Sequence, residues 1–452
     1  MHRPALATWL AGHALQYVGL MAMGLTANAQ FRYVTMGGLV LQAAGALGAM
    51  SWRTQARGRL AAVALCTWIA ALAVAGYVRM QDGDTWSPYY ASDCVVFSVV
   101  LGAFMGRELP RVVRLYAWLL PVGLLVAVSM IGSFGAAGIG ERFVTDEAEP
   151  SVLAGELCAP ALFVMLAGGE TSKTRLVAMA GCALMALFGL ITSTRHLALT
   201  PLVALMLRLV VLPRRKEWGK ALAVAVLVVA VAALIRWTPE GLEASVAALD
   251  ERLFDQEDFS SGRNEEAEVF LDVMSDWDVA FGRGLGGSYV GMFIVNSYGI
   301  NMVHYGALHL MLKGGCLLLG LFLLLALQAV GAGARKGGDA LAAAMYVVVY
   351  LVQNAGHTQF SSDPGFALAM LAMGAALVGV PAVVPRAAVA VASGPPLQTP
   401  LGALRPVIAR WVAKRWYGEA PGTPFLTEGC QEGSANPRVA RLPSGLTPGE
   451  RR

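Results

Sequence analysis

Long apolar runs separated by short polar connections follow one another along most of the chain. A helix needs about 20 predominantly apolar residues to cross the hydrocarbon core of a bilayer, and about twelve runs approach that length. The pattern therefore predicts an all-α, polytopic membrane protein. The candidate spans are Ala5–Leu25, Tyr33–Trp52, Leu60–Met80, Tyr89–Gly106, Val112–Phe134, Ser151–Leu166, Leu176–Thr192, Leu197–Leu212, Leu222–Trp237, Tyr305–Val330, Ala340–Asn354 and Phe366–Val384.

Basic residues indicate the direction of these spans, because Lys and Arg in short loops stay on the cytoplasmic side. They gather on alternate connections, and the opposite short loops carry only Arg32, Arg79, Arg142 and Arg195. This bias predicts that both termini are cytoplasmic. The first run precedes an Ala-Asn-Ala sequence that resembles a secretory cleavage site, but its length predicts an uncleaved first helix.

One large segment, about 238–303, is left on the external side between the ninth and tenth spans. Within it, apolar residues recur at helical spacing and acidic residues fill the other face. This predicts one amphipathic helix that either lies along the outer membrane surface or packs only on its own loop. The apolar positions are Val269, Phe270, Val273, Trp277, Ala280 and Phe281, and the acidic positions are Glu265, Glu266, Glu268, Asp272, Asp276 and Asp278.

Composition excludes an ordinary soluble enzyme. Hydrophobic residues make up 56% of the 452 residues and charged residues 14%, where soluble domains have about 25% charged residues. The formal charge of +4 is too small for a nucleic-acid binder, so membrane lipids are the expected surroundings. No Cys or His spacing typical of a metal site or a disulfide framework occurs.

The composition changes after the last span. Residues 1–385 form the predicted membrane domain, and residues 386–452, rich in Pro, Gly and Ser, are predicted to be a mostly disordered cytoplasmic tail. Within the tail, residues 404–417 alternate Trp, Val and Ile with Arg and Lys, and this segment is expected to lie on anionic lipid.

Charged residues that interrupt the apolar runs are unusual, since a charge at the centre of a membrane helix costs roughly 2.5 to 3.5 kcal/mol. For Arg208 and Lys313 we expect the side chains to extend to the cytoplasmic headgroups. Asp93 and Glu156 fall near the external face, where each either borders an external cavity or ends a helix in water.

Three polar residues far apart in the sequence are predicted to share the external face. Arg195 follows the seventh span, Arg263 opens the amphipathic helix, and His304 precedes the tenth span. Guanidinium groups bind phosphate oxygens through paired hydrogen bonds, and an imidazole can accept a proton from a hydroxyl group. The three together favour chemistry on a phosphate-bearing substrate.

Several short motifs follow one another around the large loop: Leu190-Ile191-Thr192-Ser193-Thr194-Arg195, Ser261-Gly262-Arg263, Phe281-Gly282-Arg283-Gly284-Leu285-Gly286, Val303-His304-Tyr305 and Lys313-Gly314-Gly315. In this order they resemble the O-antigen ligase and O-antigen polymerase superfamily. The resemblance covers roughly residues 176–384 and depends on the order of the motifs more than on any one of them. The family commonly has Asn after the His, where this chain has Tyr305.

The resemblance implies a metal-independent, multi-pass glycosyltransferase of the bacterial inner membrane that needs no cofactor. Its donor would be a glycan on undecaprenyl diphosphate. Its acceptor would be a sugar hydroxyl of the lipid A core or of a second lipid-linked glycan, at the periplasmic face. Arg195 and Arg263 would bind the diphosphate, which gains charge as it departs. His304 would act as a base or as a diphosphate ligand, because a nearby diphosphate favours the protonated imidazole.

Two further residues are weaker candidates for diphosphate contacts: His196, beside Arg195, and Arg142, in another external loop. Each main candidate also has a purely structural interpretation. Arg195 would then be an interfacial anchor, Arg263 a residue at a helix start and His304 an interfacial histidine.

Alternatives remain open at two levels. A secondary transporter or flippase of a polar or lipid-linked substrate would share the span count, although we find no repeat of six-span halves. Within the family, a ligase, a polymerase and a protein O-glycosyltransferase would share one donor site. The run Gly282–Gly287 fits GxGxxG without a βαβ context, so we expect a sharp turn near the substrate headgroup and not a dinucleotide site.

Overall fold

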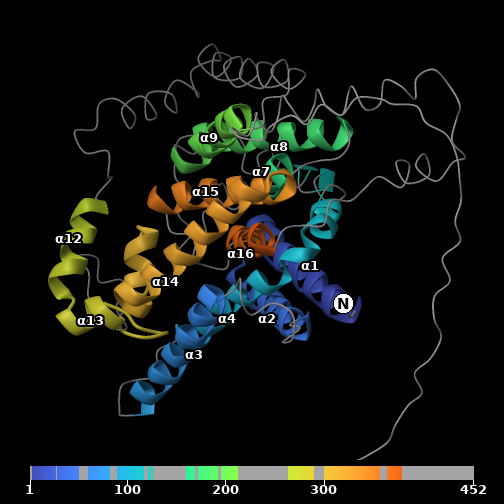
Figure 1. The fold of residues 1–452 in the computed structure, drawn as a ribbon. Coiled ribbons are helices and arrows are strands. Elements are labelled where there is room, and N and C mark those ends of the chain that lie inside the picture. Colours follow the sequence, from blue (N-terminus) through green and yellow to red (C-terminus); the bar gives the residue numbers. More distant parts are fainter. Residues whose placement is uncertain are drawn as a thin grey trace, which may run out of the picture. The chain divides into compact units, whose positions relative to one another are not determined.

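The computed structural model describes residues 3–26, 28–49, 60–81, 89–116, 121–122, 124–125, 159–167, 172–191, 195–211, 263–289, 300–356 and 364–378. All of them belong to one compact unit, Met1–Ala382. The described residues are almost entirely helical (Figure 1), with one isolated antiparallel bridge between Tyr289 and Ile300. The prediction of an all-α protein is therefore confirmed for this part of the chain.

Most helix limits agree with the apolar runs of the sequence. The predicted span Leu222–Trp237 and the predicted tail 386–452, with its basic segment 404–417, lie outside the described residues and stay predictions. The helices are α1 (Arg3–Thr26), η1 (Ala29–Phe31), α2 (Arg32–Ala49), α3 (Leu60–Gln81), α4 (Tyr90–Ser98), η3 (Val99–Glu108), α7 (Ala159–Ala167), α8 (Ser172–Ile191), α9 (Arg195–Val211), α12 (Arg263–Val273), α13 (Asp276–Phe281), α14 (Gly306–Lys336), α15 (Gly338–Gly356) and α16 (Pro364–Val378).

Four helical stretches of the described residues are long and apolar enough to cross a membrane: Leu60–Arg79, Tyr90–Tyr116, Gly306–Lys336 and Gly338–Ala355. Large apolar side chains on α3 and α14 are exposed, as expected for faces that contact lipid. The structure is thus compatible with a helical membrane protein. The exposed side chains include Leu60, Val63, Val74, Leu323, Leu324 and Leu327.

One predicted connection is helical instead. The sequence predicts a short basic connection, 107–111, between the fourth and fifth spans, but the backbone is helical from Tyr90 to Tyr116. Two of the charged residues in this helix neutralise each other, because Glu108 and Arg111 form an ion pair one turn apart. The Glu108 side chain is buried and Arg111 is exposed. Counting basic residues could not show that one of them neutralises a carboxylate on the same helix.

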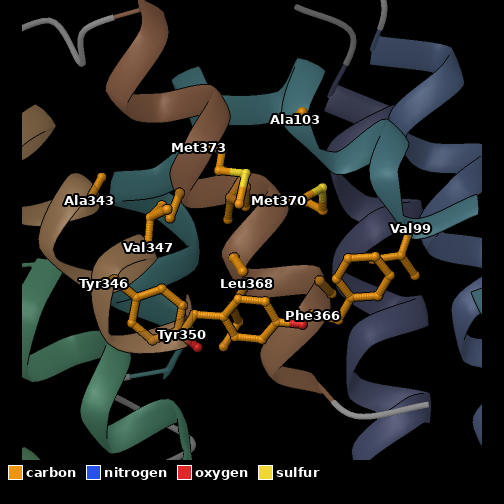
Figure 2. Close-up of a cluster of buried hydrophobic side chains, with 14 of the residues drawn as sticks. Val99, Ala103, Ala343, Tyr346, Val347, Tyr350, Phe366, Leu368, Met370 and Met373 are labelled. Carbon is orange, nitrogen blue, oxygen red and sulfur yellow. The ribbon is translucent and has the colours of Figure 1, made fainter. Parts of the chain in front are cut away.

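The core lies around α16, whose residues 365–376 are all buried. Helix α16 packs against η3, α14 and α15. Figure 2 shows side chains from η3, α15 and α16 meeting in one apolar cluster, with the rings of Tyr350 and Phe366 stacked 6.4 Å apart. Small residues let two of these helices approach closely, because a Cβ added at Gly374 would collide with the backbone of Ala103, and one added at Gly106 with Gly374.

This close approach gives a stability prediction. Gly374→Ala should lower the free energy of unfolding by about 1 to 3 kcal/mol, because the methyl group would force α16 away from η3. Gly320→Ala on α14 is the matched control, since a Cβ there meets nothing within 4 Å. The control should be neutral or stabilising by up to about 1 kcal/mol. Thermal unfolding in detergent measures both, and equal midpoints for the two variants would contradict the prediction.

The predicted amphipathic helix is two helices, so that prediction was wrong in detail. α12 ends at Val273 and α13 begins at Asp276. Ser275 caps α13, because its hydroxyl accepts from the Asp278 N–H (3.1 Å) while the Asp278 carboxylate accepts from the Ser275 N–H (3.4 Å). The helical spacing of apolar residues continues across this cap and therefore conceals the break.

Candidate functional site

The glycine-rich loop Gly282–Gly287, which follows α13, packs against a break in α14. Gly314 and Gly315 have non-helical dihedrals, which frees carbonyl groups that a continuous helix would satisfy. The loop supplies the donors: the Arg283 N–H donates to the Leu312 carbonyl (2.8 Å) and the Gly284 N–H to the Lys313 carbonyl (3.0 Å). Irregular backbone within an apolar span is tolerated where protein groups satisfy it in this way.

Glycine is required on both sides of this contact. Gly282 has φ 76° and Gly315 has φ 66°, which other residues rarely adopt. A Cβ at Gly282 would collide with Gly314, and one at Gly315 would collide with Ala280. The expected sharp turn is confirmed. The close approach that it permits is to α14 of the same chain.

Lys313 is the centre of this contact. Its side chain is 0% exposed, its Nζ lies 2.7 Å from Asp93 Oδ2, and it donates to the Gly287 carbonyl at 2.8 Å. The same carboxylate oxygen accepts from the Gly286 N–H (2.7 Å). The interpretation of Lys313 as extending to the headgroups was wrong, and so was that of Asp93 as a helix end in water. Each has its counter-ion inside the protein, where the desolvation cost is offset.

Two arginines complete the attachment of the loop. Arg283 contacts the Asp278 carboxylate (3.3 Å) and donates to the carbonyl groups of Ser288 (2.8 Å) and Val273 (2.6 Å). Arg79, in the last turn of α3, donates to the Arg283 carbonyl (2.8 Å). The end of α3, the start of α4 and the loop therefore lie together.

A second set of contacts joins α12 to the segment before α14. Glu266 Oε2 lies 2.9 Å from His304 Nδ1 and accepts the His304 N–H at 3.3 Å. Glu266 Oε1 accepts from the Tyr289 hydroxyl at 3.0 Å. The Glu266 side chain is 14% exposed and that of His304 is 49% exposed. Half of the imidazole thus remains accessible while its Nδ1 edge faces the carboxylate.

Tyr305 adds a further link. Its hydroxyl donates to Asn264 Oδ1 at 3.0 Å. Asn264 follows Arg263, the first residue of α12. The structure therefore brings the backbone of Arg263 and the side chain of His304 into one neighbourhood, although 41 residues separate them in the sequence. The tyrosine at the position after the histidine serves to hold α12.

A small apolar cluster packs beside the contacts of Glu266 with His304 and Tyr289. The ring of Phe270 meets that of Tyr289 edge to face, with centroids 5.4 Å apart. An antiparallel bridge pairs Tyr289, which follows the glycine-rich loop, with Ile300, which lies shortly before His304. The backbone that carries His304 is therefore anchored on both sides. The buried members of the cluster are Phe270, Met274, Tyr289, Val303 and Leu312.

The contacts also change the proton affinities of two groups. Burial alone would raise the pKa of Glu266, but its hydrogen bond and charge interaction with His304, together with the hydrogen bond from Tyr289, hold that pKa below its ordinary value. Burial and the nearby Glu266 charge raise the pKa of Tyr289. Glu266 is therefore a carboxylate and Tyr289 a neutral donor at neutral pH.

The side chains of the other predicted site residues lie outside the part of the chain that the structure describes. Arg195 and His196 open α9, which packs on α8 and α15, but their side chains lie outside the described residues. The side chain of Arg263 is likewise outside them, as is all of Arg142. Glu156 belongs to the same undescribed part. The described residues contain no group of three or more His, Cys, Asp or Glu that could hold a metal ion.

Sequence reasoning missed the contact of Glu266 with His304, the contact of Asn264 with Tyr305 and the pairing of Asp93 with Lys313. Glu266 is one of several acids on the predicted helix, and its distinguishing feature is a partner 38 residues away. Arg208 is also not simply interfacial, because it donates to the Met165 carbonyl of α7.

No known family model matches the chain, and no curated protein matches it.

Proposed function

We propose that the protein is a glycosyltransferase that moves a glycan from undecaprenyl diphosphate to an acceptor sugar hydroxyl. The reaction would take place at the periplasmic face of the bacterial inner membrane. The acceptor would belong to the lipid A core or to a second lipid-linked glycan.

The observation that carries this proposal is the attachment of the first turn of α12 to the residues before α14. The hydrogen bonds of Glu266 with His304 (2.9 Å) and of Tyr305 with Asn264 (3.0 Å) bring the backbone of Arg263 near His304. A guanidinium for the diphosphate and an imidazole for the acceptor hydroxyl are the groups that such a transfer requires. Arg195, His196 and Arg142 are proposed to add cationic contacts to the diphosphate.

The lipid carrier also fits the position of this neighbourhood. His304 and Tyr305 directly precede Gly306, where the apolar stretch Gly306–Lys336 begins. A diphosphate attached to a polyprenyl chain sits at the boundary between headgroups and hydrocarbon. Residues at the end of a span are therefore at the depth of the bond that breaks.

The test is transfer by the purified protein from an undecaprenyl-diphosphate glycan. The lipid A core and a second lipid-linked glycan are offered in separate reactions. Product on the core alone would support a ligase, and a ladder on the lipid carrier would support a polymerase. No product with either acceptor, from folded protein that still binds the donor, would contradict the proposed function.

A further inference from the structure

We propose that Glu266 is a positioning residue that holds His304 in the tautomer with its proton on Nδ1, leaving the Nε2 lone pair for the acceptor hydroxyl. This inference rests on the proposed function for the identity of the hydroxyl. The tautomer of the His304 ring is inferred from the contacts of Glu266 alone.

The first step of the argument concerns the carboxylate itself. Glu266 Oε1 accepts from Tyr289 and Oε2 accepts from both the backbone and the ring of His304. With a side chain only 14% exposed, Glu266 has its hydrogen-bonding capacity directed into the protein. It is therefore unsuited to touch a substrate, and it acts through His304.

The second step concerns the ring. A carboxylate only accepts hydrogen bonds, so the nitrogen that faces it must carry the proton. In the neutral imidazole the other nitrogen, Nε2, then has no proton and can accept one. Because the His304 side chain is 49% exposed and Nδ1 faces Glu266, the exposed edge is the basic one.

The third step is the reaction. The acceptor oxygen forms a bond to the anomeric carbon of the donor while the bond from that carbon to the diphosphate oxygen breaks. The leaving diphosphate keeps the electron pair of that bond. The hydroxyl proton moves to Nε2, and Glu266 stabilises the imidazolium ion that results. The proton then passes to the released diphosphate or to water, which restores the neutral ring.

The deciding experiment reads the tautomer directly. In protein labelled with ¹⁵N-histidine, the couplings between ring protons and ring nitrogens separate the two neutral tautomers, and His304→Gln identifies the His304 signals. At a pH where the ring is neutral, wild-type protein should show the Nδ1–H form. Glu266→Gln should shift the ring toward the Nε2–H form, because the amide can donate to Nδ1.

Two control variants test whether the change of tautomer is specific to Glu266. Glu265→Gln removes the neighbouring carboxylate, which is exposed, and should leave the tautomer unchanged. Tyr289→Phe removes only the hydroxyl bond to Glu266 and keeps the contact with Phe270, so it should also leave the tautomer unchanged. A wild-type ring in the Nε2–H form would overturn the inference, and it would do so even if Glu266→Gln failed to fold.

Transfer kinetics provide the second readout. Glu266→Gln should lower kcat by about 10²-fold or more while the KM for the donor changes less than about twofold, because His304 and not Glu266 meets the substrate. Full kcat in Glu266→Gln, in an enzyme that otherwise transfers, would refute the positioning role alone. No transfer by the wild type would refute the proposed function, while the tautomer would still decide the role of Glu266.

Discussion

Replacing Lys313 with methionine is expected to lower the free energy of unfolding by about 3 to 5 kcal/mol, the usual cost of removing one partner of a buried ion pair. The Lys313 side chain is 0% exposed and lies 2.7 Å from Asp93. Methionine fills a similar volume but leaves the Asp93 carboxylate buried with the Gly286 N–H. Thermal unfolding in detergent should show a midpoint well below that of wild type.

Two comparisons separate the ion pair from general damage. Lys313→Met combined with Asp93→Leu should recover much of the lost stability, because replacing a whole buried pair with apolar residues is often close to neutral. Lys336→Met, at the exposed end of the same helix, should cost no more than about 1 kcal/mol. An unchanged midpoint in Lys313→Met would show that the buried pair contributes little.

The same variant should also loosen the glycine-rich loop, since Lys313 donates to the Gly287 carbonyl. Arg283 in that loop is held by Asp278, Ser288 and Val273. Trypsin should therefore cleave after Arg283 more readily in Lys313→Met than in wild type. Equal rates of cleavage would mean that the arginine contacts alone hold the loop.

Hydropathy predicted the helices well because their boundaries depend on local composition. The run Leu60–Met80 became α3 (Leu60–Gln81), and the run Leu176–Thr192 became α8 (Ser172–Ile191). The failures occurred where two local signals conflicted. Basic residues near Arg107 indicated a loop, but a neighbouring glutamate at position 108 lets the helix continue through them.

The buried ion pair could not be predicted for a different reason. Asp93 and Lys313 are separated by more than two hundred residues, and a single charge within an apolar run has the same sequence signal whether it is paired or reaches the headgroups. In the folded chain the glycine-rich loop packs on α14 at the break at Gly314 and Gly315, and Asp93 and Lys313 each hydrogen-bond to that loop.

The sequence selects candidate site residues by type and by predicted side of the membrane, but it does not show which residues contact one another. Arg263 and His304 stand out because charge bias assigns them to one face of the membrane. Glu266 does not stand out among the acids of its helix. Its role follows from its hydrogen bonds with His304, which lies 38 residues away in the sequence.

Arg263→Ala is expected to reduce glycan transfer by at least about 10²-fold, the typical loss of a group that stabilises charge developing in the transition state. Arg263→Lys should remain impaired, because an ammonium group cannot form the paired hydrogen bonds that a guanidinium makes to phosphate. The measurement is kcat and KM with the undecaprenyl-diphosphate donor. A loss of kcat would indicate contact with the departing diphosphate, and a rise in KM alone would indicate binding of the ground state.

The control for this prediction is Arg107→Ala, which removes an exposed arginine from η3 and should leave transfer unchanged. Thermal unfolding should show that Arg263→Ala remains folded, since hydrogen bonds of Asn264 and Glu266 and the packing of Phe270 hold α12. Normal transfer by a folded Arg263→Ala protein would remove this residue from the site. It would also weaken the proposed function, which relies on the short distance between the backbone of Arg263 and His304.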